Sequence, residues 1–121
     1  MGDSSIIGIL TDILEQNISN INKESIYFEN ITFQAFNIYF EVENKKYQMS
    51  IELDSGTDIY LKYHKGYRKN GDLLFEPHPI MFDLDFKKEI FNIKNTIKSD
   101  YELRLKFMVE LICNKINEKS K

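Results

Sequence analysis

The sequence predicts an α+β fold in which an N-terminal helix is followed by a four-stranded antiparallel meander sheet and two C-terminal helices, with the helices packed on one face of the sheet. The period of the apolar residues supports this prediction. It is three to four up to residue 21, two between residues 36 and 63, and three to four again after residue 85. The 121 residues contain no repeat or linker and have a length typical of one domain, so a single α+β domain is predicted over 1–121.

The first helix is predicted from one apolar stripe, with polar residues on the opposite side. We expect this helix to end near Asn22. Residues 25–33 are ambiguous, because Asn30 interrupts a short strand-like run. The stripe is formed by Ile6, Ile9, Leu10, Ile13, Leu14, Ile18 and Ile21.

A hairpin is the best-supported element of the predicted sheet. Residues 36–42 and 47–53 both alternate apolar and polar side chains, and Glu43-Asn44-Lys45 forms a turn between them. The alternation resumes at residues 59–63. Asn70-Gly71 is a strong hairpin signal, so a fourth strand should follow over residues 72–75.

Two helices are predicted after the sheet. Asp85 is a candidate N-cap for a helix that carries Phe86 and Ile90 on its apolar side. Ser99-Asp100-Tyr101-Glu102 has the spacing of a capping box and should begin the last helix. That helix presents an apolar inner face formed by Leu105, Met108, Val109, Ile112 and Ile116.

The single cysteine, Cys113, is expected to be a small core residue, because it lies on the apolar face of the last predicted helix. One cysteine cannot form an intramolecular disulfide, which fits a reducing compartment. The first residues do not resemble a signal peptide, and no apolar run approaches the ~20 residues of a membrane span. We therefore expect a soluble cytoplasmic protein without a membrane partner.

Residues 60–69 contain four basic side chains, three tyrosines and one histidine but no acidic residue. This composition suits a protein interface, a nucleic-acid site or an edge strand that lysines protect from aggregation. The net charge of −3 argues against a dedicated nucleic-acid binder. The candidate binding residues are Tyr60, Lys62, Tyr63, Lys65, Tyr67, Arg68 and Lys69.

The first half of the chain is acidic, with ten acidic and three basic residues in positions 1–58. These carboxylates form either solvated faces or a surface that steers a basic protein partner. The candidate partner-binding residues are Asp12, Glu15, Glu41, Glu43, Glu52, Asp54 and Asp58.

No catalytic residue, cofactor or metal site is predicted. The sequence lacks a nucleophile elbow, a phosphate loop and a dinucleotide fingerprint, so we do not expect an enzyme. Glu76, His78, Asp83 and Asp85 are metal-binding residue types, but their spacing matches no established pattern. A small metal-binding or catalytic domain centred on Glu76 and His78 is the weakest alternative.

In general character, a small acidic α+β domain without catalytic motifs matches the immunity and inhibitor proteins of bacteria and phages. We therefore expect a cytoplasmic protein-binding domain that neutralises a toxin or other enzyme by direct binding. The alternative is a nucleic-acid- or nucleotide-binding module that uses residues 60–69. Homodimerisation is also left open, because an exposed aromatic patch often marks an interface. The aromatic residues concerned are Tyr27, Phe28, Phe33, Phe36 and Tyr39.

Overall fold

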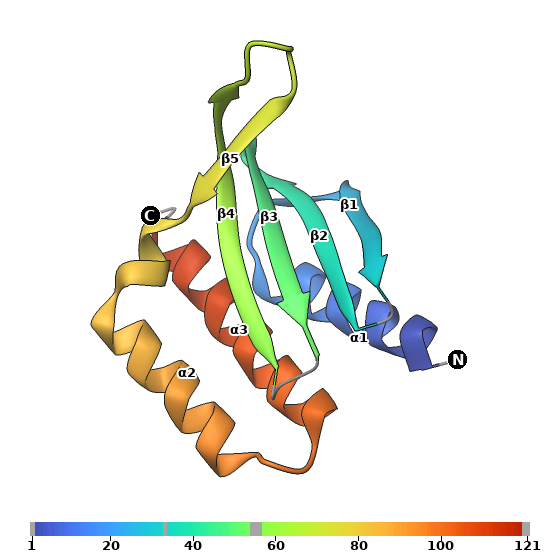
Figure 1. Cartoon of the computed structure of the whole chain (residues 1–121), viewed down its shortest axis with the longest axis vertical. Helices are drawn as coiled ribbons and strands as arrows, with labels where there is room; N and C mark the ends of the chain where they lie inside the picture. Colours follow the sequence, from blue (N-terminus) through green and yellow to red (C-terminus); the bar gives the residue numbers. More distant parts are fainter. Residues whose placement is uncertain (1, 33, 54–56, 120–121) are drawn as a thin grey trace.

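The computed structural model describes residues 2–32, 34–53 and 57–119 and has an α+β architecture, as predicted (Figure 1). Its elements are α1 (Gly2–Asn17), β1 (Ile21–Thr32), β2 (Ala35–Val42), β3 (Lys45–Glu52), β4 (Asp58–Tyr67), β5 (Leu73–Pro77), the 3-10 helix η2 (Pro79–Phe82), α2 (Leu84–Thr96) and α3 (Tyr101–Lys119).

The sheet is an antiparallel meander with the order β1-β2-β3-β4-β5, so every strand pairs with its neighbour in sequence. Both predicted hairpins are confirmed. Glu43 (φ 50°) and Asn44 (φ 68°) form the β2–β3 turn, which has the two positive φ angles of a tight hairpin. Gly71 (φ 92°) lies in the β4–β5 turn. Pro77 ends the edge strand β5, where a missing backbone N–H is tolerated.

The predicted number of four strands is wrong, because the ambiguous segment before residue 33 forms the additional strand β1. Its pairing with β2 shifts register between Asn22 and Tyr27 and again between Asn30 and Thr32. Each irregularity interrupts the alternation of side chains between the two faces. The sequence of β1 therefore lacks the regular period of two that identifies the strands β2 and β3.

Helix α1 ends at Asn17 and not near Asn22. The Ile18 N–H still donates to the Leu14 carbonyl over 3.0 Å, and Asn20 then adopts a left-handed conformation with φ 63°. The apolar stripe extends beyond the end of the helix, because Ile18 is buried in the core and Ile21 is the first residue of β1.

Both predicted caps of the C-terminal helices are wrong by one or two residues. The Asp83 carboxylate accepts a hydrogen bond from the Phe86 N–H over 3.1 Å and caps α2, while Asp85 lies inside the first turn. At α3, the Asp100 carboxylate accepts from the Leu103 N–H over 3.0 Å. Aspartate is as good an N-cap as serine, so the sequence before each helix contains two possible N-cap residues that lie one or two positions apart.

The helices α1 and α3 pack against each other and cover one face of the sheet (Figure 1). Helix α2 packs mainly against α3 and η2, so it adds to the margin of this layer rather than to its centre. One apolar cluster joins the layers, and it includes the fully buried Ile38, Met49 and Leu61 of the sheet and Val109 and Ile112 of α3. None of the described helices combines the length and apolarity needed to span a membrane.

Candidate functional site

The face of the sheet opposite α1 and α3 is not covered by any described helix, and we call it the open face (Figure 1). Successive side chains of a strand point to opposite faces. Ile38 in β2, Met49 in β3 and Leu61 in β4 belong to the core. The residues directly before and after each of them therefore point to the open face. Tyr27 and Tyr60 are 60% and 39% exposed and place two aromatic rings there.

A hydrogen-bonded chain crosses the open face from β1 to β3. Gln48 Nε2 donates to the Tyr39 hydroxyl over 2.8 Å, and this hydroxyl donates to Glu29 Oε1 over 3.3 Å. Asn37 Nδ2 donates to the same carboxylate oxygen over 3.2 Å, while Ser50 Oγ donates to Asn37 Oδ1 over 2.8 Å. Each member thus restricts the rotamer of its neighbour, so the surface is ordered without a ligand.

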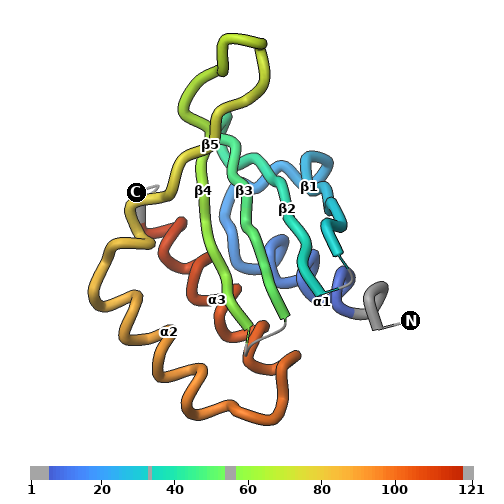
Figure 2. The backbone as a smooth tube through the Cα atoms, in the orientation of Figure 1, coloured from blue at the N-terminus to red at the C-terminus, as the bar shows by residue number. Residues whose placement is uncertain are grey.

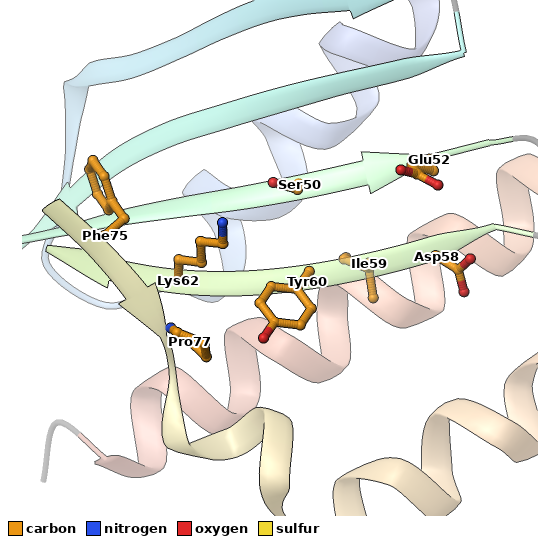
Figure 3. Close-up of a pocket in the computed structure, with 8 residues that line it drawn as sticks. All are labelled: Ser50, Glu52, Asp58, Ile59, Tyr60, Lys62, Phe75 and Pro77. Atoms are coloured by element: carbon orange, nitrogen blue, oxygen red, sulfur yellow. The ribbon is translucent and has the colours of Figure 1, made fainter.

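A cavity of about 600 Å³ opens on this face between β3, β4 and β5 (Figure 3). The sheet register positions its walls, because Ser50 pairs with Tyr60 across β3 and β4, and Lys62 pairs with Pro77 across β4 and β5. The residues that line the cavity are Ser50, Glu52, Asp58, Ile59, Tyr60, Lys62, Phe75 and Pro77.

Opposite charges lie at the two ends of this cavity. Lys62 lies beside Phe75 at one end, and Glu52 and Asp58 lie at the other (Figure 3). Asp58 is paired with Lys94 over 2.5 Å, whereas no ion pair between described residues includes Lys62 or Glu52. The Lys62 ammonium lies 5.9 Å from the centre of the Tyr60 ring. Among the described residues, Lys62 and Glu52 thus give the cavity a cation and an anion outside any ion pair, next to the aromatic rings of Tyr60 and Phe75.

The β4–β5 hairpin continues beyond the rest of the sheet and carries an aromatic cluster at its base (Figure 2). Phe75 contacts Tyr39 at 5.9 Å between ring centres and His64 at 6.0 Å, and His64 contacts Tyr67 at 5.1 Å. A bulge between His64 and Gly66 changes the register there. The cluster joins the hairpin to the open face.

The alternation of β4 divides the basic and tyrosine-rich residues 60–69. Tyr60 and Lys62 lie on the open face, whereas Tyr63 points to the other side and contacts His78 at 5.8 Å. Lys65 forms an ion pair with Glu76 over 3.3 Å, and the hydrogen bond within this pair raises the pKa of the ammonium. The remaining members, Tyr67, Arg68 and Lys69, are exposed at the hairpin tip.

The candidate acidic residues do not gather on one face. Asp12 and Glu15 lie on α1, on the far side of the sheet from the open face. Glu41 lies two residues after Tyr39 in β2, so its side chain points to the open face. Glu43 lies in the following turn. Asp54 lies outside the described residues, and the other two members line the cavity.

The aromatic residues of positions 26–40 are also divided between the two faces. Phe28 and Phe36 contact each other at 6.2 Å and pack with the core, while Tyr27 and Tyr39 contact each other at 6.0 Å on the open face. Phe33 lies outside the described residues. Of the described members of this set, the two tyrosines therefore contribute to a surface on which a second chain can bind.

The candidate metal-binding residues have structural roles. Imidazole Nδ1 of His78 accepts the Ile80 N–H over 3.2 Å, Asp83 caps α2, and Glu76 is paired with Lys65. Within residues 2–32, 34–53 and 57–119, no group of three His, Cys, Asp or Glu residues is arranged to hold a metal ion.

The prediction that Cys113 is a core residue is confirmed, because its side chain is completely buried. Burial raises the pKa of the thiol to about 12, and the nearby Glu110 carboxylate acts in the same direction. A thiol with this pKa stays protonated near neutral pH and is neither a nucleophile nor a metal ligand.

Sequence reasoning missed most of the residues that build the open face. In the sequence, Asn37, Gln48 and Ser50 are only polar members of the alternating segments 36–42 and 47–53. The alternation assigns each of them to a face, but it does not show which neighbours they meet. Their connection to Glu29 depends on the register between β1 and β2, which the sequence did not provide.

Comparison with models of known families, with curated proteins and with solved structures gives no match for this chain. The function must therefore be argued from the geometry of the chain itself.

Proposed function

We propose that this chain is a protein-binding domain that acts through the open face of its sheet, and that it is an immunity-type inhibitor of a toxin or other enzyme. The observation that supports the proposal most directly is the uncovered sheet surface with exposed Tyr27 and Tyr60. Tyrosine is enriched at the centres of protein interfaces, because it supplies a large contact area together with a hydrogen-bonding group.

The hydrogen-bonded chain from Glu29 to Ser50 supports binding without rearrangement. Ordering a rotamer-rich side chain on binding costs about 0.5–1.5 kcal/mol. Side chains that are already restrained in the free protein avoid part of this cost. An inhibitor with a preorganised surface can therefore bind a preformed enzyme surface tightly.

The charges of the open face favour a basic partner. By the strand register, the carboxylates of Glu29, Glu41 and Glu52 belong to this face. The lysines on it are Lys46, opposite Glu41, and Lys62 in the cavity. Carboxylates on an inhibitor attract the cationic surface of an enzyme that binds an anionic substrate, and they raise the rate of association at low salt. The proposed compartment is the cytoplasm, in keeping with the single buried thiol of Cys113.

The test compares two pairs of truncated aromatic side chains on opposite sides of the molecule. The tagged chain captures its partner from a nuclease-treated lysate of its source at low and moderate salt. The purified partner is then assayed for affinity and enzymatic activity. We expect one-to-one inhibition, with Tyr27→Ala/Tyr60→Ala weakening binding by about 100-fold or more, since anchor residues each contribute about 2 kcal/mol. Phe91→Ala/Tyr101→Ala is the matched control, because both side chains are exposed on the helical side.

Two results would contradict the proposal. If the control pair weakens binding and the open-face pair does not, the partner binds the helices instead. If the purified partner binds but keeps its full activity, the chain is not its inhibitor. Sedimentation of the purified chain distinguishes a homodimer, which the Tyr27→Ala/Tyr60→Ala variant would dissociate if the same face were used.

Nucleic-acid binding is the second candidate, and the exposed tip of the β4–β5 hairpin supports it. Tyr67, Arg68 and Lys69 lie together there, and an aromatic ring beside two cations suits single-stranded nucleic acid. In this case Arg68→Ser/Lys69→Ser should weaken oligonucleotide binding and make it less dependent on salt. Unchanged binding by this variant would exclude the hairpin tip as the site.

A further inference from the structure

A second cavity, of about 370 Å³, lies at the end of the sheet where β4 passes the start of β3. It is separate from the cavity on the open face, with which it shares no lining residue. Its wall includes Lys45, Lys46, Tyr47, Tyr63, His64 and His78.

All six of these side chains can donate hydrogen bonds, and no carboxylate lines the cavity. Lys45 and Lys46 are both exposed, and neither takes part in an ion pair between described residues. Three carboxylates belong to residues near the cavity, and Glu41 is opposite Lys46 in the β2–β3 register. Glu43 accepts a hydrogen bond from Asn20 Nδ2 over 2.8 Å, and Glu76 is paired with Lys65. The cavity is therefore a concave surface with positive charge at its rim.

The inner wall of this cavity is a rigid aromatic group. Tyr47 stacks on Phe40 at 5.3 Å and contacts His78 at 6.0 Å, and Tyr63 meets the same imidazole edge to face at 5.8 Å. His78 is fixed further, because its Nδ1 accepts the Ile80 N–H. Since Nδ1 is the acceptor, the neutral imidazole carries its hydrogen on Nε2.

His64 provides an independent indication of a functional role at this wall. Its Nε2 is buried and has no hydrogen-bond partner among the described residues. Buried polar atoms without a partner are uncommon in folded proteins, and each calls for an explanation beyond stability. In this chain, such an atom belongs to His64, which lines the cavity and whose ring also contacts Tyr67 and Phe75.

We propose that this cavity binds the phosphate group of a small phosphorylated molecule. Lys45 and Lys46 neutralise the charge of the phosphate, the phenols of Tyr47 and Tyr63 donate to its oxygens, and the aromatic wall contacts the organic part. The volume is at the small end of the range for ligand pockets, which fits a phosphate ester of a single sugar better than a dinucleotide. The site is distinct from the open-face cavity, because the two cavities share no lining residue.

The test is a titration of the full-length ¹⁵N-labelled chain, followed by NMR at constant ionic strength. The probes are inorganic phosphate and ribose 5-phosphate, with sodium chloride as the reference anion. We expect saturable shifts of the amides near Lys46, Tyr47 and His64. Lys45→Ser/Lys46→Ser should weaken binding about tenfold or more, because each ammonium contributes a charge-assisted hydrogen bond. Lys87→Ser/Lys88→Ser removes the same charge from the exposed surface of α2 and should bind with unchanged affinity.

The four substituted residues are exposed, so both variants are expected to fold. Tighter binding of ribose 5-phosphate than of phosphate identifies an ester as the ligand, and equal binding identifies free phosphate. Both results support the site. Shifts that chloride reproduces, or equal affinity of the Lys45→Ser/Lys46→Ser variant and the unmodified chain, would overturn it.

Discussion

Arg104 connects two loops that are distant in sequence, although its side chain is only 6% exposed. Its Nε donates to Thr57 Oγ1 over 3.0 Å, while Nη1 donates to the carbonyls of Ile97 over 2.8 Å and Lys98 over 3.1 Å. Thr57 is fully buried and has a φ of 73°, which is unfavourable for a β-branched residue. The hydrogen bonds from Arg104 stabilise this conformation and fix the start of β4, and with it the charged end of the open-face cavity.

Replacing Arg104 with methionine tests this role. The variant Arg104→Met keeps much of the apolar stem but leaves the two carbonyls and the Thr57 hydroxyl without their donor. Because each buried group that loses its partner costs about 1–3 kcal/mol and three groups lose theirs, the free energy of unfolding should fall by about 3 kcal/mol or more. Urea denaturation measures this change. The exposed Arg68→Met is the control and should stay within about 0.5 kcal/mol of the original chain. Equal effects of the two substitutions would show that Arg104 is not structurally important.

The ends of the elements are set by local hydrogen bonds that several adjacent residues can make. Asp100 and Ser99 are both good N-cap residues, yet the Leu103 N–H donates to Asp100. Arg104 explains the choice, because its bonds to Ile97 and Lys98 hold the α2–α3 loop in the conformation that begins α3 at Tyr101. Hydrogen bonds between α3 and the loop before it thus favour one of two equivalent N-cap residues.

The cap assignment predicts different effects for two neighbouring substitutions. Asp100→Ala should lower the free energy of unfolding by about 1 kcal/mol, because it removes the acceptor for an N–H of the first turn. Ser99→Ala should change it by less than about 0.5 kcal/mol. Thermal or chemical denaturation of both variants provides the comparison. A larger effect of Ser99→Ala would restore the capping box that the sequence indicated.

At the scale of the whole molecule, the helix layer buries one face of the sheet and leaves the other face exposed to solvent. The apolar cluster lies between the sheet and the pair α1 and α3, and the polar chain lies on the open face. The central strand β3 has paired neighbours on both sides, while the β4–β5 hairpin extends past them. Stability should therefore decrease from β3 towards the hairpin tip.

Amide hydrogen exchange measures this gradient. The amides of Met49 and Ile51 in β3 should be among the slowest and approach the rate set by global unfolding, because they are paired and completely buried. The amides near Asn70 should exchange fastest, since this turn is exposed. Similar protection at the tip and in β3 would instead indicate a hairpin that is ordered by a further contact.

The sequence by itself determined the α+β class, the β2–β3 and β4–β5 hairpins and the burial of Cys113. Each depends on local chemistry: the period of apolar residues, the residues that accept positive φ, and the hydrophobicity of one helix face. The boundary of α1, the caps and the strand β1 could not be derived from local chemistry alone, because packing selected among equivalent local signals.

The candidate sites were decided by tertiary structure alone. Strand alternation divided residues 60–69 between two faces, and the register placed Lys62 beside Phe75 and Lys46 near His64. Such contacts join residues from different strands, and pairing across a sheet is not encoded by any short stretch of sequence.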